Sequence, residues 1–96
     1  SRNAYLDDAQ RRVAVELNKM LRIAIERLHR GEAVAEVEAA CVKALHAAGF
    51  DEVDYVEVRS PEDLSRLGPG PIAQGQGRIL AAARIGGTRL IDNMSV

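Results

Sequence analysis

The chain has 96 residues, of which 47% are hydrophobic, 28% are charged and 3% are aromatic. This length suits one small domain, whose core has to be built from aliphatic rather than aromatic side chains. A formal net charge of −1 provides no basic excess to neutralise a phosphate backbone, which argues against nucleic acid as a partner.

Cys41 is the one cysteine of the chain, so it has no partner for an internal disulfide. A lone thiol is typical of a reducing compartment, and we expect a cytoplasmic protein. No apolar run is long enough to cross a bilayer, and the first residues lack the basic and apolar regions of a signal peptide, so we expect no membrane partner. The chain opens on Ser1-Arg2-Asn3 without an initiating Met, which suggests an excised fragment.

A first helix is predicted from Asp7 to Gly31. Asp7 and Gln10 have the spacing of a capping box, and Gly31 is suited to the residue after a helix end. Val15 and Ile23 fall outside the apolar stripe, so they are either exposed or covered by something absent from this chain. The stripe itself recurs at three- and four-residue steps and consists of Val13, Leu17, Met20, Leu21, Ala24 and Leu28.

A second helix is predicted over residues 33–48, with Gly49 as its stop. The connection between the two helices is very short, which favours an antiparallel pair with facing aliphatic stripes. The stripe of the second helix consists of Val34, Val37, Cys41, Ala44, Leu45 and Ala48.

After the second predicted helix, the sequence pattern changes from helical to extended. Residues 53–58 are rich in β-branched side chains and predict a strand. Ser60-Pro61-Glu62-Asp63 has the pattern of a helix start and predicts one short helical turn. Residues 68–77 hold too much Gly and Pro for regular structure and predict a loop. This loop is not a phosphate-binding loop by its pattern, because no strand leads directly into it and no Lys-Ser or Lys-Thr follows.

A hairpin is predicted at the end of the chain, with strands over residues 78–85 and 88–94 and a turn at Gly86-Gly87. The order helix, helix, strand, loop, strand, strand indicates an α+β fold. We therefore predict a single domain over residues 1–96, in which two antiparallel helices pack on a small three-stranded antiparallel sheet.

Few residues of the predicted helices and strands are candidates for catalysis, metal binding or partner binding. His29 and His46 lie near predicted helix ends, where histidine often has a structural role, and Cys41 lies on an apolar stripe, so we predict no catalytic role and no metal site for them. Arg84 and Arg89 flank the hairpin turn and either face an acidic partner or are solvated strand ends. Asp92-Asn93 receives no chemical role, although it is placed to help close the sheet or a domain junction.

Three segments carry a resemblance to a known family. Ser1-Arg2-Asn3-Ala4-Tyr5-Leu6 resembles the end of the Ser-Ser-Arg-Asn-x-Tyr-Leu signature of pantothenate synthetases. Asp54-Tyr55-Val56-Glu57-Val58 is similar to the first C-terminal strand of that family, and residues 82–93 are similar to its closing hairpin. Spacing and order agree over nearly the whole chain.

The resemblance implies the C-terminal lid domain of a ligase that joins pantoate to β-alanine through a pantoyl-adenylate, using ATP and Mg²⁺. It implies that residues 1–6 form the junction segment and that Ser1 and Arg2 bind ATP phosphates. It also implies a preceding Rossmann-like domain and a homodimer of the parent enzyme. The Met and first Ser that precede Ser1 in the family signature are absent here. We therefore expect no catalysis by the fragment alone.

An alternative from a different class remains open at this stage. Exposed Val15, Ile23 and the hairpin edge are compatible with a non-enzymatic module for protein interaction or dimerisation. RNA binding by the basic residues of the first helix is disfavoured, because acidic residues are interspersed among them.

Overall fold

The computed structural model describes residues 8–73 and 75–96, except for the side chains of residues 9, 10, 13 and 14. Five helices and strands follow one another along this part of the chain. They are α1 (Asp8–His29), α2 (Val34–Ala48), β1 (Glu52–Arg59), β2 (Arg78–Ile85) and β3 (Thr88–Ser95).

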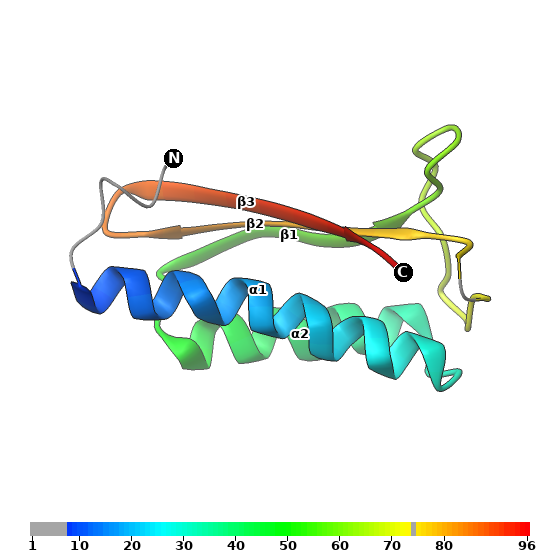
Figure 1. Ribbon diagram of the computed structural model, residues 1–96, viewed down its shortest axis with the longest axis horizontal. Coiled ribbons are helices and arrows are strands. Elements are labelled where there is room, and N and C mark those ends of the chain that lie inside the picture. The colour runs from blue at the N-terminus through cyan, green and yellow to red at the C-terminus, as the bar shows by residue number, and fades with distance from the viewer. Residues whose placement is uncertain (1–7, 74) are drawn as a thin grey trace.

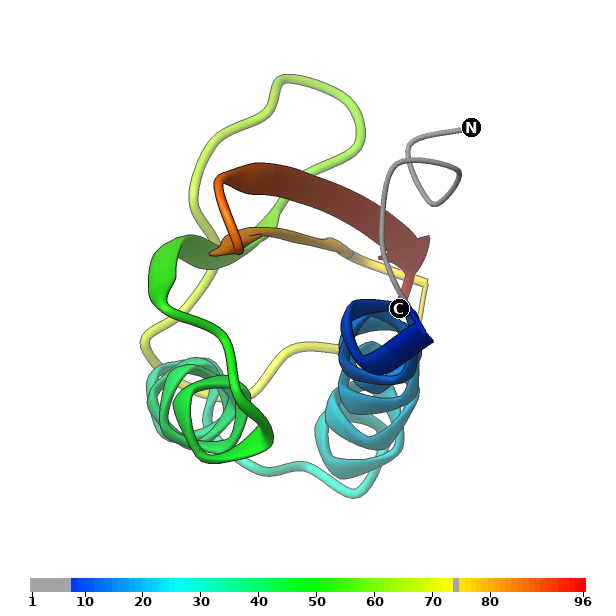
Figure 2. The same ribbon diagram turned by 90° about the vertical axis from the view of Figure 1, so that its left-hand side faces the viewer.

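The described residues form two layers. The three strands make one antiparallel sheet in the order β1-β2-β3. Both helices lie side by side on the same face of this sheet, with α2 beneath β1 and α1 beneath β2 and β3, and neither covers the other face (Figures 1 and 2). The predicted α+β fold with two antiparallel helices on a three-stranded antiparallel sheet is confirmed. We call the face opposite α1 and α2 the open face.

The core lies between the helices and the sheet and is one continuous hydrophobic cluster. Its aliphatic composition follows from the scarcity of aromatic residues, and among the described residues Phe50 is its one aromatic member. Full burial of one such aliphatic side chain contributes roughly 1.5–3 kcal/mol to folding. The largest fully buried side chains belong to Leu21, Leu28, Leu45, Ile79, Val34, Val37, Val58 and Cys41.

The helix ends agree with the glycine positions in the sequence. The α1 helix gives way to a turn at residues 30–31, where Gly31 has a φ of +88°. Gly49 has a left-handed conformation at the end of α2, and its N–H donates to the carbonyls of Leu45 and His46. Asp7, the first residue of the predicted capping box, lies outside the described residues.

The start of α2 is capped by the glycine-rich loop instead of by a side chain. Ala33 at the N-cap position offers no side-chain acceptor. The free N–H groups of Val34 and Ala35 donate instead to the carbonyls of Gly70 and Pro69, at 3.2 and 3.0 Å. Unpaired N–H groups at a helix start are costly unless they find such acceptors. The described residues of the loop, 68–73 and 75–77, are irregular as predicted, and the loop stabilises the helix start.

The predicted helical turn after β1 is wrong. Residues 61–63 form a hydrogen-bonded turn and no helix. The Ser60 hydroxyl accepts the N–H of Glu62, two residues on, as in a serine turn, and Leu64 then takes a positive φ of +62° that ends the turn. The bounds predicted for β2 are confirmed, β1 and β3 are slightly longer than predicted, and Gly86-Gly87 forms the expected hairpin turn with φ angles of +55° and +80°.

Candidate functional site

The two predicted site residues, Ser1 and Arg2, lie outside the described residues. Their role in binding phosphate therefore stays a prediction. The described part of the chain nevertheless has one surface whose composition sets it apart, namely the open face of the sheet.

A strip of apolar side chains runs across the open face. Tyr55 of β1, Ala82 of β2 and Ile91 of β3 occupy one row of the sheet by register, and Leu80 lies one row along on β2. None of these four belongs to the cluster beneath the helices or packs against it. Ala82 is fully buried between its neighbours, whereas Ile91 is 48% exposed. We call these four residues the apolar strip.

A bulge in β1 widens the open face at one end of the strip. The register between β1 and β2 shifts between Val53 and Tyr55, so Asp54 has no partner of its own on β2. An extra residue of this kind lets two successive side chains lie on the same side of the sheet. Asp54 and Tyr55 both lie on the open face for this reason.

Asp54 holds two arginines in what we call the Asp54 clamp. Arg89 Nε donates to Asp54 Oδ2 at 2.8 Å, and Arg84 Nε lies 3.3 Å from each carboxylate oxygen. The hydrogen bond from Arg89, followed by that from Arg84, holds the pKa of Asp54 below its ordinary value. The two arginines that flank the hairpin turn are therefore bound by a carboxylate of the same sheet. The sequence analysis offered an acidic partner or solvated strand ends, and neither alternative included this contact.

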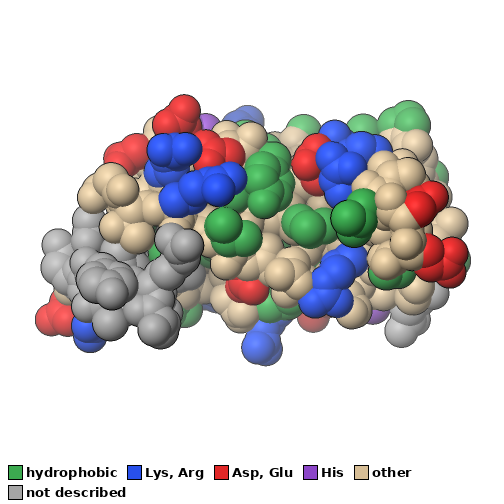
Figure 3. All heavy atoms as spheres, turned by 90° about the horizontal axis from the view of Figure 1, so that it is seen from above, with side chains coloured by type: hydrophobic (Ala, Val, Ile, Leu, Met, Phe, Trp, Pro, Cys, Tyr) green, Lys and Arg blue, Asp and Glu red, His purple; other side chains and the backbone are tan. Residues whose placement is uncertain are grey.

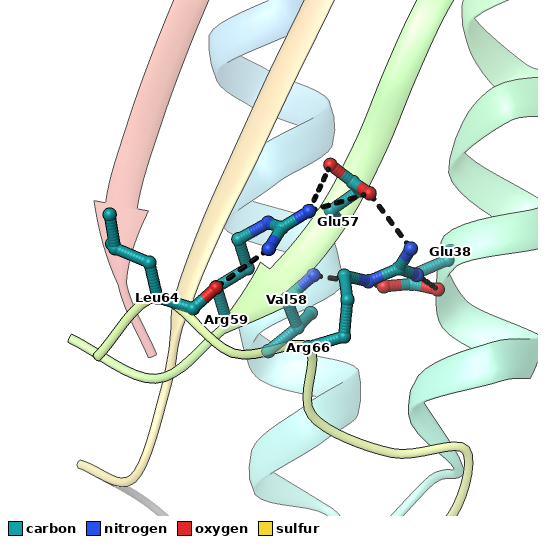
Figure 4. Close-up of polar contacts among 6 residues, drawn as sticks. All are labelled: Glu38, Glu57, Val58, Arg59, Leu64 and Arg66. Carbon is teal, nitrogen blue, oxygen red and sulfur yellow. Dashed lines mark hydrogen bonds and ion pairs between the residues drawn. The ribbon is translucent and has the colours of Figure 1, made fainter. Parts of the chain in front are cut away.

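A second cluster of charged residues lies at the other end of the strip (Figure 4). Arg66 Nη1 donates to Glu57 Oε2 on the open face, and Arg66 Nη2 donates to Glu38 Oε1 on α2, each at 2.8 Å. Arg59 Nη2 lies 3.2 Å from both oxygens of Glu57. We call these four residues the edge cluster, because Arg66 joins the helix layer to the open face around the edge of β1.

The edge cluster also covers the backbone of the edge strand. Glu38 Oε2 accepts the N–H of Val58 at 2.9 Å, and the N–H of Leu67 donates to the Val58 carbonyl at the same distance. Arg59 Nη1 donates to the carbonyl of Leu64 at 2.6 Å, which fixes the turn above the sheet. The edge of β1 is thus closed to further strand pairing at Val58.

The remaining candidates from the sequence lie away from this face. His29 and His46 are exposed in the last turns of α1 and α2. Cys41 is buried, and burial raises the pKa of its thiol to about 11. Among residues 8–73 and 75–96, no three His, Cys, Asp or Glu side chains are grouped so that they hold a metal ion. No helix in the same ranges is long and apolar enough to span a bilayer.

Asp92 and Asn93 connect the sheet to its surroundings. Asn18 of α1 donates to Asp92 Oδ2 at 3.3 Å, and Arg78 Nε donates to Asn93 Oδ1 at 2.7 Å. Asp92 therefore ties β3 to the helix layer, while Asn93 orients an arginine at the end of β2.

Comparison with known proteins identifies the family. The family model described as pantoate-beta-alanine ligase matches residues 1–95. The chain belongs to the pantoate-beta-alanine ligase family. It is 53% identical over 96 residues to a pantothenate synthetase of Caulobacter vibrioides and 47% identical over 95 residues to one of Maricaulis maris.

The matches cover all or nearly all of this chain but only part of its relatives. The chain spans 34% of the Caulobacter vibrioides protein and 32% of the Maricaulis maris protein, so it corresponds to about a third of a pantoate-beta-alanine ligase. A crystal structure of pantothenate synthetase from Thermus thermophilus superimposes with a TM-score of 0.82 at 34% identity. That similarity covers 98% of this chain and 33% of the solved one.

Few sequence patterns point to the two charged clusters of this ligase-family domain. Glu57 and Arg59 are two residues apart on one strand, so they were predictable neighbours on one face. The partners Glu38 and Arg66 are 28 residues apart, and only the position of the turn after β1 brings them together. Glu38 is half-buried in the structure, and no local sequence pattern pairs it with Arg66.

Proposed function

We propose that this chain is the lid domain of an ATP-dependent ligase that condenses pantoate with β-alanine to give pantothenate, AMP and pyrophosphate. The reaction passes through a pantoyl-adenylate. We use the term parent polypeptide for the longer chain that contains these residues. In this proposal it consists of a Rossmann-like nucleotide-binding domain followed by this lid, forms a homodimer and acts in the cytoplasm.

The observation that supports the proposal is the family match over residues 1–95 together with relatives named pantothenate synthetase. The chain corresponds to about a third of those relatives, and in this proposal most of the substrate pocket lies in the other two thirds. We therefore propose that the 96-residue chain alone does not catalyse the reaction.

Arg2 and Ser1 are the proposed contacts to ATP, which enters as its Mg²⁺ complex. When the pantoate carboxylate attacks the α-phosphorus, negative charge grows on the phosphate oxygens and on the leaving pyrophosphate. The planar guanidinium of Arg2 is suited to paired hydrogen bonds with two of these oxygens, and the Ser1 hydroxyl adds another donor. Both contacts then stabilise the transition state more than the bound substrates.

A lid also protects the intermediate. An acyl-adenylate is hydrolysed by water, so the site has to be closed before adenylation and to stay closed until β-alanine attacks. Residues 1–6 join the lid to the nucleotide-binding domain in this proposal, so closure of the lid and delivery of Arg2 are one movement.

The test uses the parent polypeptide with ATP, pantoate and β-alanine. Arg2→Ala is expected to slow pyrophosphate release by about 30- to 1,000-fold, equivalent to roughly 2–4 kcal/mol for a lost transition-state donor. Arg30→Ala is the matched control, since Arg30 is exposed in the turn after α1. Absence of pantothenate formation by the unmodified parent would refute the ligase function. Unchanged rates in Arg2→Ala would remove Arg2 from the mechanism alone.

The alternative is a non-enzymatic interaction or dimerisation module. It is favoured by the exposure of Val15 and Ile23 on α1, at 62% and 43%. Sedimentation of the 96-residue chain separates the two proposals. A tight dimer, combined with a parent polypeptide that lacks ligase activity, supports the module.

A further inference from the structure

We infer that the outer face of α1 is a contact between two copies of this chain, which pair as antiparallel helices around a two-fold axis at Lys19. The contact lies outside the proposed ATP-binding residues and does not depend on the ligase function. It gives a partner to Val15 and Ile23, which are exposed because the core of the domain does not include them.

The outer face of α1 is accessible along most of the helix. Figure 2 shows α1 at the border of the helix layer, with the sheet above it and α2 on one side. At 3.6 residues per turn, the side chains of this face lie within about 60° on either side of Lys19. They are exposed, apart from the half-buried Glu16. We call them the α1 face, which consists of Arg12, Val15, Glu16, Lys19, Arg22, Ile23 and Glu26.

The charges of the α1 face are self-complementary about Lys19. Glu16 and Arg22 lie three residues before and after it. Arg12 and Glu26 lie seven residues before and after it. In an antiparallel pair with its two-fold axis at Lys19, a residue before the axis in one copy lies opposite the residue equally far after the axis in the other. Each acidic side chain of the face therefore meets a basic one, and every pairing occurs twice.

The same axis pairs the two exposed apolar side chains of α1. Val15 and Ile23 lie four residues before and after Lys19 and are 62% and 43% exposed. Val15 of one copy therefore lies beside Ile23 of the other, on both sides of the axis. Lys19 meets its own copy on the axis, so its ammonium turns toward solvent while its aliphatic stem covers the apolar pair.

The order of the charges favours a second copy in antiparallel orientation over other occupants. In a parallel pair each residue would face its own copy, so every charged position of the α1 face would meet a like charge. A purely acidic partner would place like charges against Glu16 and Glu26, and a purely basic one would do the same to Arg12 and Arg22. The chain itself carries both signs in the required order.

The pairing is expected to be weak and sensitive to salt. The α1 helix has 22 residues, about 33 Å, and Lys19 lies close to its middle, so two copies overlap over nearly the whole helix. A contact between two single helices is smaller than a standard interface, and exposed ion pairs are screened by salt. The hydrophobic side chains gathered on the open face lie on the other layer of the molecule and are not part of this contact (Figure 3).

The test exchanges charges across the two-fold axis. Sedimentation equilibrium measures the dissociation constant of the 96-residue chain up to about 1 mM, in about 0.01 M salt. Arg12→Glu and Glu26→Arg each turn two attractive pairs into repulsive ones, so each is expected to raise the dissociation constant at least about tenfold. The double variant restores both pairs with their signs exchanged and is expected to return to within about threefold of the unmodified chain. Glu36→Arg is the matched control, because Glu36 is exposed on α2.

Restoration by the double variant supports the pairing, because no other partner or surface brings positions 12 and 26 together. A chain that stays monomeric up to about 1 mM overturns the inference. A dimer that neither single variant weakens also overturns it, since that dimer uses another surface. The same holds for a double variant that stays as weak as the single ones while circular dichroism shows intact helices. Pantothenate formation by the parent polypeptide tests the ligase function separately.

Discussion

Arg89 on β3 donates to Asp54 on β1 at 2.8 Å, across the strand that separates them. Arg84 on the intervening β2 shares the same carboxylate, so one side chain joins all three strands on the open face. The bulge at Asp54 makes this possible, because it turns the carboxylate toward the hairpin arginines.

The Asp54 clamp predicts a specific dependence of stability on pH. The folded-state pKa of Asp54 lies below the value of about 3.9 expected for the unfolded chain. Its stabilising contribution is therefore complete above that value and is lost as the pH falls through the folded-state pKa. Asp54→Asn should lower the free energy of unfolding at pH 7, and its difference from the wild type should shrink at acidic pH.

Urea unfolding of the 96-residue chain at a series of pH values from about 7 down to about 2.5 measures this difference. Glu62→Gln is the control, because it removes an exposed carboxylate of the 60–66 turn without touching the clamp. A constant difference between Asp54→Asn and the wild type over the whole pH range would contradict the assignment.

Replacement of Gly68, where the loop meets α2, is predicted to lower the free energy of unfolding. Its φ is +102°, and an added Cβ would lie 2.8 Å from the Cβ of Val34. Gly68→Ala should therefore lower the free energy of unfolding by about 2–4 kcal/mol, combining backbone strain with overpacking. Gly70→Ala is the matched control, because a Cβ there meets no atom within 4 Å. Chemical denaturation compares the two, and an equal effect of both substitutions would show that the contact with Val34 is unimportant.

The sequence predicted the elements that depend on periodicity and on glycine. The stop at Gly49 and the hairpin turn at Gly86-Gly87 follow from local rules, and the structure confirms them. The predicted stripes are confirmed at the positions that are buried, namely Leu17, Leu21, Ala24, Leu28, Val34, Val37, Cys41 and Leu45. The prediction at Ser60 failed because two local rules compete there, and the serine hydroxyl accepts the nearer N–H.

Most contacts of the two charged clusters were beyond local rules, and the pairing of Glu57 with Arg59, two residues apart on one strand, is the exception. Asp54 and Arg89 are 35 residues apart, and their contact depends on a one-residue shift in register that no sequence pattern indicates. The apolar strip was hidden for a related reason. In the sequence, Leu80 and Ile91 look like ordinary strand residues, because only the structure shows that both helices cover the opposite face. The role of Ser1 and Arg2 stays a prediction.

Glu38 is predicted to stabilise the domain more than its partly exposed position suggests. It is the acceptor for the Val58 N–H on the edge of the sheet and the partner of Arg66. Glu38→Ala leaves that backbone donor without its acceptor, which should lower the free energy of unfolding by about 1–3 kcal/mol. Glu38→Gln retains a neutral acceptor for Val58 and should cost less.

The two functions of Glu38 can be measured separately. Hydrogen exchange at the Val58 amide should accelerate strongly in Glu38→Ala and only slightly in Glu38→Gln, because the glutamine still accepts that N–H. A double-mutant cycle with Arg66→Ala isolates the ion pair, whose N–O distance is 2.8 Å. Glu36→Ala is the control, since Glu36 is exposed in the first turn of the same helix. If Glu38→Ala and Glu36→Ala behave alike, the contact between α2 and the sheet edge does not stabilise the fold.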